Sequence, residues 1–115
     1  MSLKIYHNPC CSKSRQTLAL LTDRGQTPEI IEYLKNAPSA AEIRDVMGML
    51  GLDTVRDMMR TGEAIYKDLS LKSVDNEEKL IQAMAENPKL IERPIVIKDG
   101  KAAIGRPPEA VLALL

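Results

Sequence analysis

The sequence contains no tryptophan and no phenylalanine, and three tyrosines are its only aromatic residues. Its core must therefore be built from Leu, Ile, Val, Met and Ala side chains. It also lacks an apolar stretch long enough for a signal peptide or a transmembrane helix, so we expect a cytoplasmic protein with no membrane partner. Sixteen basic and sixteen acidic residues cancel. This balance gives no support for binding to nucleic acid, although it permits a local positive pocket.

Cysteine and histidine are equally scarce, with two cysteines and one histidine in the chain. Cys10 and Cys11 are adjacent, so they cannot form a disulfide framework, and they fit a reducing compartment. A lone histidine beside two neighbouring cysteines provides no ligand set for a metal, so we expect no bound metal and no resident cofactor. The length of 115 residues is that of one domain, 1–115, which can bury a core without crosslinks.

What the chain does contain is a cysteine between a predicted strand and a predicted helix. Residues 3–6 alternate apolar and polar side chains, and the helical spacing from about Ser12 to Asp23 is followed by the stop signal Gly25. Cys11 lies between them, where unpaired N–H groups and the positive helix end point at its sulfur. Such a location lowers the pKa of a thiol and produces the reactive thiolate. We therefore predict that Cys11 is a nucleophile rather than a buried apolar cysteine.

The remaining pattern predicts an α/β fold. A second strand over 29–34 must run parallel to the first, because a helix joins the two. A helical block follows over about 38–88. The segment 94–105 reads as a hairpin with an Asp-Gly turn, and Pro107-Pro108 opens a final helix. The order βαβ, helical insertion, ββα is that of a thioredoxin-like mixed sheet.

Two helices inside the helical block carry clear end signals. Ser39 and Glu42 form a capping box, and Gly51 closes the helix that they open. A longer helix is predicted over about 76–86. The stretch 63–71 is also predicted to be helical, although its periodicity is weak.

Three arginines lie at the boundaries of predicted elements. Arg60 ends a short helix, Arg93 precedes the third strand, and Arg106 ends the fourth. Side chains at such boundaries converge on sites in α/β sheets, although each arginine taken alone also fits an exposed surface charge. A planar guanidinium matches a tetrahedral oxyanion through two hydrogen bonds. The joint placement of the three arginines with the loop of Cys11 favours a site for a doubly charged oxyanion.

Four segments of the sequence share the spacing of one known family: His7-Asn8-Pro9-x-Cys11 with Ser14-Arg15, then Arg60, Arg93-Pro94-Ile95-Val96 and Arg106-Pro107. Over nearly the whole chain they resemble the glutaredoxin-dependent arsenate reductase (ArsC) family. The resemblance implies a thioredoxin-like fold with a helical insertion. Because the chain ends at Leu115, it looks like the short chromosomal branch of that family.

The resemblance also implies roles for individual residues. Cys11 is the implied catalytic nucleophile, His7 lowers the pKa of its thiol, and Pro94 forms a cis bond that faces it. From the residues alone, His7 is equally well a loop histidine that bonds backbone, and Pro94 an ordinary trans proline at a strand start. The implied substrate-binding residues are Arg60, Arg93 and Arg106, and the implied supporting residues are His7, Asn8, Ser14, Arg15 and Pro94.

The activity that the resemblance implies is reduction of arsenate, or a similar oxyanion, to arsenite. Electrons come from glutathione as co-substrate and from glutaredoxin. We expect Cys10 to be a bystander, because a disulfide between adjacent cysteines closes a small strained ring. Two other functions stay open. One is an Spx-type regulator that binds RNA polymerase, although such regulators carry Cys-x-x-Cys where this chain has Cys11-x-x-Ser14. The other is a glutathione-linked thiol oxidoreductase without arsenate turnover.

Overall fold

The structure is a computed structural model that describes residues 3–115. Contacts within the chain divide it into two compact units. The first unit comprises Met1–Asn36 and Arg93–Leu115, and the second comprises Ala37–Glu92. The helical insertion expected over about 38–88 lies within the second unit. That residues 1–115 behave as one domain stays a prediction.

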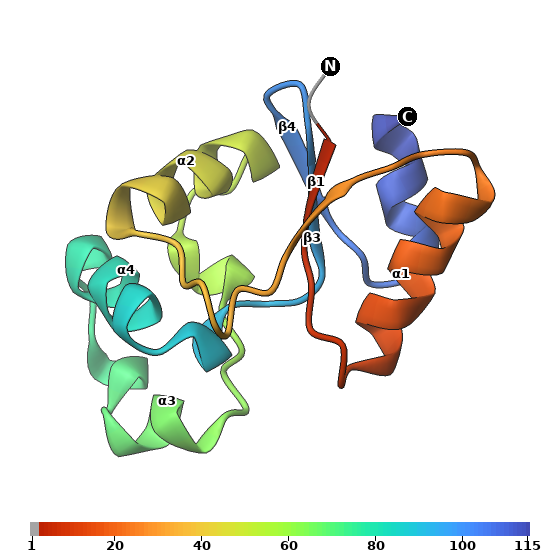
Figure 1. The fold of residues 1–115 in the computed structure, drawn as a ribbon. Helices are drawn as coiled ribbons and strands as arrows, with labels where there is room; N and C mark the ends of the chain where they lie inside the picture. Colours follow the sequence, from red (N-terminus) through yellow and green to blue (C-terminus); the bar gives the residue numbers. More distant parts are fainter. Residues whose placement is uncertain (1–2) are drawn as a thin grey trace. The chain divides into compact units, whose positions relative to one another are not determined.

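The first unit contains a four-stranded mixed sheet with the strand order β2-β1-β3-β4. Figure 1 labels three of these strands, β1, β3 and β4. Strands β1 (Leu3–Tyr6) and β2 (Glu29–Ile31) pair in parallel, and α1 (Ser12–Asp23) connects them. Strand β3 (Ile95–Lys98) pairs antiparallel with both β1 and β4 (Lys101–Ile104). The predicted parallel pairing of the first two strands, the predicted terminal hairpin and the bounds of α1 are therefore confirmed.

The core of the first unit is aliphatic, as a chain without Phe or Trp requires. Ile5, Leu21, Val96 and Val111 form a cluster in which each residue is fully buried. A 3₁₀ helix over Pro108–Leu114 supplies Val111 and packs against α1 and β4 (Figure 1). Burial of one such side chain contributes about 1.5–3 kcal/mol, so this cluster holds α1 against the sheet.

The second unit is helical, with α2 (Ala40–Leu50), α3 (Ala64–Asp68), α4 (Glu77–Glu86) and three short 3₁₀ helices over Val55–Met58, Leu71–Ser73 and Pro88–Leu90. The capping box of Ser39 and Glu42 opens α2, and Gly51 ends it with a φ of 71°. Asn76 caps α4, which packs against α2. The two helices with clear end signals are therefore confirmed.

The structure corrects three details of the predicted elements. Strand β2 ends at Ile31 instead of residue 34, because the N–H groups of Lys35 and Asn36 turn back to the carbonyl of Glu32. The final helix is a 3₁₀ helix, in which i+3 hydrogen bonds suit a short terminal segment. The weakly periodic stretch 63–71 is α-helical only over Ala64–Asp68.

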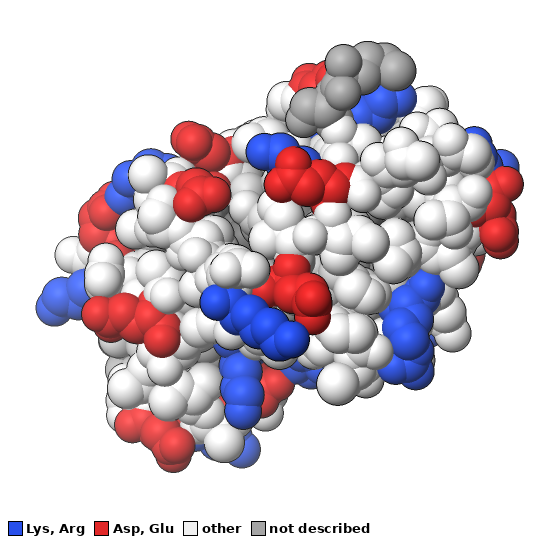
Figure 2. All heavy atoms as spheres, viewed as in Figure 1, with Lys and Arg blue, Asp and Glu red and all other residues white. Residues whose placement is uncertain are grey.

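Charged side chains are interspersed on the surface. On the face drawn in Figure 2, Lys and Arg side chains alternate with Asp and Glu, in keeping with a formal net charge of zero. Among residues 3–115, no helix combines the length and the apolar character that crossing a membrane requires.

Gly105 follows β4 at a point where two other segments approach closely. A Cβ atom on Gly105 would lie 2.6 Å from Oγ1 of Thr17 and 2.8 Å from Cγ of Pro94. Neither neighbour moves readily, since Thr17 donates to the carbonyl of Lys13 and the carbonyl of Pro94 accepts from Gly105. Only glycine fits between α1 and the start of β3.

We expect Gly105→Ala to lower the free energy of unfolding by about 1–3 kcal/mol, because the added methyl group overpacks this contact. Urea denaturation measures the change. The control is Gly48→Ala in α2, where an added Cβ meets nothing within 4 Å and should stabilise by about 0.5–1 kcal/mol. Equal effects of the two substitutions would contradict the packing argument.

Candidate active site

The loop before α1 presents the side chain of Cys11. The Cys11 N–H donates to the carbonyl of Asn8 at 3.0 Å, and the Cys11 carbonyl accepts from the N–H of Arg15 at 3.0 Å. Cys11 therefore closes a turn and opens the helix as its N-cap residue. The Asn8 Oδ1 atom holds the turn by accepting from the N–H of Cys10 at 3.0 Å. A sulfur atom thus occupies the place where N-cap residues usually put an oxygen that accepts from the first turn.

The pKa of the Cys11 thiol lies below its ordinary value, through opposing influences. Burial raises the pKa, but hydrogen bonding and charge from the Arg93 guanidinium lower it, as do the backbone N–H groups of Ser14 and Lys13. These donors favour the thiolate, so Cys11 carries more of the nucleophilic form at neutral pH than a free cysteine does. The side chain of Cys10 is exposed.

Arg93 connects the start of β3 to this loop. Burial lowers the pKa of Arg93, but interactions with the Cys11 sulfur and the Tyr33 hydroxyl raise it above its ordinary value. The guanidinium therefore stays charged beside the sulfur. The Arg93–Pro94 peptide bond is cis, as the resemblance implied, and Arg106–Pro107 is a second cis bond that the sequence did not predict.

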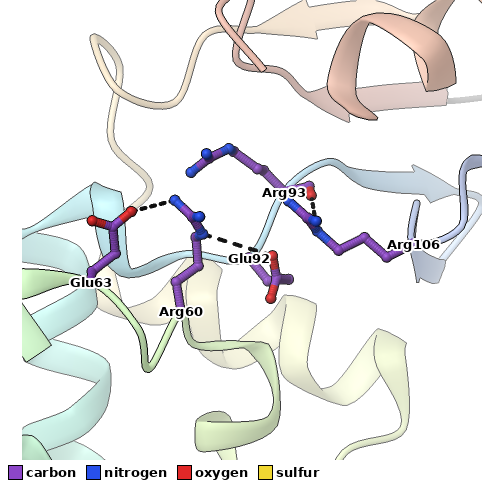
Figure 3. A network of polar contacts seen from close by, with 5 residues as sticks. All are labelled: Arg60, Glu63, Glu92, Arg93 and Arg106. Atoms are coloured by element: carbon purple, nitrogen blue, oxygen red, sulfur yellow. Dashed lines mark hydrogen bonds and ion pairs between the residues drawn. The ribbon is translucent and has the colours of Figure 1, made fainter. Parts of the chain in front are cut away.

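Arg106 is linked to the same segment. Its Nε donates to the carbonyl of Arg93 at 2.9 Å (Figure 3). Arg106 follows β4, which pairs with β3 in the sheet. The first unit thus places Cys11, Arg93 and Arg106 in one connected group.

His7 reaches this loop through Ser14. Its Nδ1 shares a hydrogen bond of 2.6 Å with the Ser14 hydroxyl, which also accepts from the N–H of Asn8 at 3.0 Å. All three residues are buried. Burial lowers the pKa of His7, with a smaller contribution from Arg15, and Glu32 opposes the shift. His7 is therefore neutral at neutral pH, and its imidazole holds the Ser14 hydroxyl in place. The sequence had left open a hydrogen bond from His7 to backbone instead.

Arg15 braces the outside of the loop. Its Nη1 donates to the carbonyl of Pro9 at 2.8 Å. The guanidinium thus connects the first turn of α1 to the turn that carries the cysteines. Together with Ser14, it holds the loop from the helix side.

Arg60 belongs to the second unit. It forms ion pairs with Glu63 and with Glu92, the latter at 4.0 Å between Nε and Oε1 (Figure 3). Its backbone N–H donates to the carbonyl of Leu90 at 2.7 Å. Two carboxylates therefore offset its charge within its own unit. The expected convergence of Arg60 with Cys11 stays a prediction.

Comparison with known proteins identifies the family. Residues 6–114 match the ArsC family. This chain belongs to the ArsC family.

Three similar proteins show how far the likeness extends. An arsenate reductase of Haemophilus influenzae is 52% identical over 116 residues, covering 100% of both chains. The uncharacterized protein YfgD of Escherichia coli K12 is 54% identical, covering 98% of this chain and 96% of its own length. The solved structure of the arsenate reductase from Vibrio cholerae has 53% identity and a TM-score of 0.97, covering 100% of this chain and 98% of that chain. The thioredoxin-like α/β fold is therefore confirmed.

Sequence reasoning missed one member of this ArsC site. Tyr33 was predicted to lie on the second strand, but it follows β2 in a turn, is fully buried and interacts with Arg93. The available signal was weak. The pattern of residues 29–34 predicted a strand and carried no information about which charged group the side chain of Tyr33 would influence.

We expect Cys11, and not Cys10, to be the thiol that reacts at low pH. The measurement is the rate of alkylation by iodoacetamide against pH for Cys10→Ser and Cys11→Ser, each the matched control of the other. Cys10→Ser should keep the fast phase at low pH, because Arg93 and the N–H groups of α1 still lower the pKa of Cys11. If Cys11→Ser kept that phase instead, the assignment of the nucleophile would be wrong.

Proposed function

We propose that this protein reduces arsenate to arsenite through the Cys11 thiolate, with glutathione and glutaredoxin as electron donors. The observation that carries the proposal is the Cys11 sulfur at the first turn of α1, with its pKa lowered by Arg93. Support comes from the arsenate reductases of Haemophilus influenzae and Vibrio cholerae, which share about half of its residues. Glutathione is a co-substrate in this proposal, with no resident cofactor.

The proposed reaction begins with nucleophilic attack. The Cys11 thiolate forms a bond to pentavalent arsenic, and one arsenate oxygen takes up protons and leaves as water. A glutathione thiolate then bonds to the Cys11 sulfur, and the electron pair of the S–As bond passes to arsenic, which departs as trivalent arsenite. Glutaredoxin finally exchanges with the Cys11–glutathione disulfide and restores the free thiol.

The arginines would bind the oxyanion and offset its charge. Arg93 already interacts with the sulfur that attacks, so in the proposed complex it lies beside the new S–As bond. Arg106 would add a second guanidinium from the end of β4. Arg60 is the proposed third, with Glu63 and Glu92 holding its side chain until substrate binds. Guanidinium groups aimed at developing negative charge stabilise the transition state.

The proposed electron donors come from outside the chain because Ser14 stands where a resolving cysteine would be. The Ser14 hydroxyl is buried and bonded to His7 and Asn8, so it serves the loop structure instead of thiol exchange. A reduced glutathione pool is a feature of the cytoplasm, and we propose that the reaction takes place there.

We expect arsenate-dependent oxidation of NADPH when the protein is coupled to glutathione, glutaredoxin and glutathione reductase. Cys11→Ser should abolish turnover, since it removes the nucleophile. Cys10→Ser is the matched control and should retain turnover, since the proposed cycle uses one protein thiol.

The coupled assay also separates the rival functions. If the wild-type protein shows no turnover with arsenate but exchanges glutathione disulfides at Cys11, it is a thiol oxidoreductase. If it shows neither activity and instead binds purified RNA polymerase, it is a regulator. Either result would overturn the proposed arsenate reduction.

We expect Arg106→Lys to lower kcat/KM for arsenate by about tenfold or more, because one charge-assisted hydrogen bond contributes about 1.5–3 kcal/mol. Lysine keeps the positive charge but lacks the planar fork that matches an oxyanion. The control is Arg24→Lys at the exposed end of α1, which should leave kcat/KM unchanged. Equal activity of the two variants would remove Arg106 from the proposed substrate site.

A further inference from the structure

Cys10 is the second thiol of the chain, and the proposed reduction gives it no role. It directly precedes Cys11 in the loop before α1. Both thiols are free, and Cys10 is exposed while Cys11 is partly exposed. Two neighbouring sulfur atoms at the start of one helix are therefore open to the same ligand from solvent.

The backbone that carries the two thiols is held in place. Cys10 and Cys11 are the third and fourth residues of a turn that begins at Asn8, and the N–H of Cys11 closes this turn by donating to the Asn8 carbonyl at 3.0 Å. The Asn8 Oδ1 atom accepts from the N–H of Cys10 at 3.0 Å, and Arg15 donates to the carbonyl of Pro9 at 2.8 Å. The Cα atoms of the two cysteines lie about 3.8 Å apart, the spacing across a trans peptide bond. A ligand that takes both sulfurs therefore has to order only two short side chains.

We propose that Cys10 and Cys11 form a dithiol site that binds trivalent arsenic through both sulfur atoms. The ligand is arsenite or an organic arsenical, and its binding does not require the proposed reduction. Trivalent arsenic is a soft centre that exchanges oxygen ligands for thiolates. Arsenous acid, As(OH)₃, exchanges two As–O bonds for two As–S bonds: each thiol gives up its proton, and the two displaced hydroxyl groups leave as water. Arsenic stays trivalent, so the step needs no oxidant and no reductant.

The spacing of the pair suits a bridging atom better than a disulfide. A disulfide between adjacent cysteines has to bring the sulfurs to about 2.05 Å inside a small ring. An arsenic atom between the sulfurs adds one member to that ring and lets the sulfurs stand farther apart. Its three bonds are pyramidal, so both sulfurs lie on one side of it, where two neighbouring side chains can provide them.

The number of available ligands also favours trivalent arsenic. Among residues 3–115, no group of three or more His, Cys, Asp or Glu side chains could hold a metal ion, whereas zinc in structural sites takes four ligands. Trivalent arsenic forms three bonds, so two thiols leave one position, which a hydroxyl group or the organic group of an arsenical fills. Cys11 supplies the first bond readily, because Arg93 and the N–H groups of α1 lower the pKa of its thiol.

Attachment through two sulfurs has a measurable consequence. Once Cys11 binds arsenic, the bond to Cys10 forms within the same molecule, and a linked second contact strengthens binding by about 10²–10⁴-fold. A monothiol such as glutathione then displaces the ligand poorly, whereas a dithiol such as dithiothreitol displaces it. The occupied pair also blocks the Cys11 sulfur, so trivalent arsenic inhibits any reaction in which Cys11 is the nucleophile.

The test uses phenylarsine oxide, which takes up two thiols and releases one water. Mass spectrometry counts arsenic atoms per chain, and competition with glutathione gives the dissociation constant. We expect a single arsenic per wild-type chain, and a dissociation constant that rises about a hundredfold or more in Cys10→Ser. Inorganic arsenite should likewise protect Cys11 from alkylation by iodoacetamide, and the concentration needed should rise similarly in Cys10→Ser.

The matched control moves the second thiol without removing it. Thr22 is exposed near the far end of α1, roughly 15 Å from the start of the helix at about 1.5 Å per residue. The double variant Cys10→Ser/Thr22→Cys has as many thiols as the wild-type protein, but its two sulfurs cannot reach one arsenic atom. It should bind phenylarsine oxide as weakly as Cys10→Ser does.

Three results would overturn the proposal: equal affinity of the wild-type protein and Cys10→Ser, tight binding by the double variant, or an arsenic atom that joins two chains. None of these measurements needs arsenate or glutaredoxin. Tight binding by the wild-type protein without arsenate turnover would uphold the dithiol site and overturn the proposed function. Arsenate turnover with equal affinities would do the reverse.

Discussion

The site depends on the interaction between the Cys11 sulfur and the Arg93 guanidinium. Burial by itself raises the pKa of the Cys11 thiol, and Arg93 outweighs that effect together with the backbone N–H groups of Ser14 and Lys13. The same contact helps to keep the half-buried guanidinium of Arg93 charged. The sheet makes the contact possible, because β1 leads into the loop of Cys11 while β3 begins just after Arg93, and the two strands are antiparallel neighbours. The last residue of β1 therefore lies beside the first residue of β3, at the same end of the sheet.

Around this pair, the loop is held mainly by hydrogen bonds that satisfy backbone groups. Ser14 contributes twice: its N–H faces the Cys11 sulfur, and its hydroxyl joins His7 to the N–H of Asn8. A cysteine at this position would form weaker hydrogen bonds and loosen the loop. The serine thus keeps Cys11 in place while leaving the chain without a second thiol at the Cys-x-x-Cys spacing. This arrangement is physically consistent with a reaction that draws its electrons from an external thiol.

A chain with no net charge still produces a positive environment at one cysteine, because the arrangement of charges matters more than their sum. Arg93 and Arg106 flank the hairpin of β3 and β4, where Nε of Arg106 donates to the carbonyl of Arg93 and the Arg93 guanidinium interacts with the Cys11 sulfur. Arg60, by contrast, is paired with Glu63 and Glu92 in the second unit. The arginines that look alike in the sequence therefore have different electrostatic surroundings. Local pairing decides how much of each charge is available to an anion.

The sequence by itself determined the features whose causes are local. Helix α1, the capping box at Ser39 and the place of Cys11 at the start of α1 follow from hydrogen-bond patterns within a few residues, which side-chain types reveal directly. The family resemblance added the cis bond at Pro94, whereas the three arginines already stood out at the boundaries of predicted elements. Only the tertiary structure decided that β2 ends at Ile31, that Gly105 admits no side chain, and that Tyr33 is fully buried in a turn after β2. Each of these depends on atoms from segments far apart in the chain, and residue periodicity carries no information about which distant side chain will fill a given space.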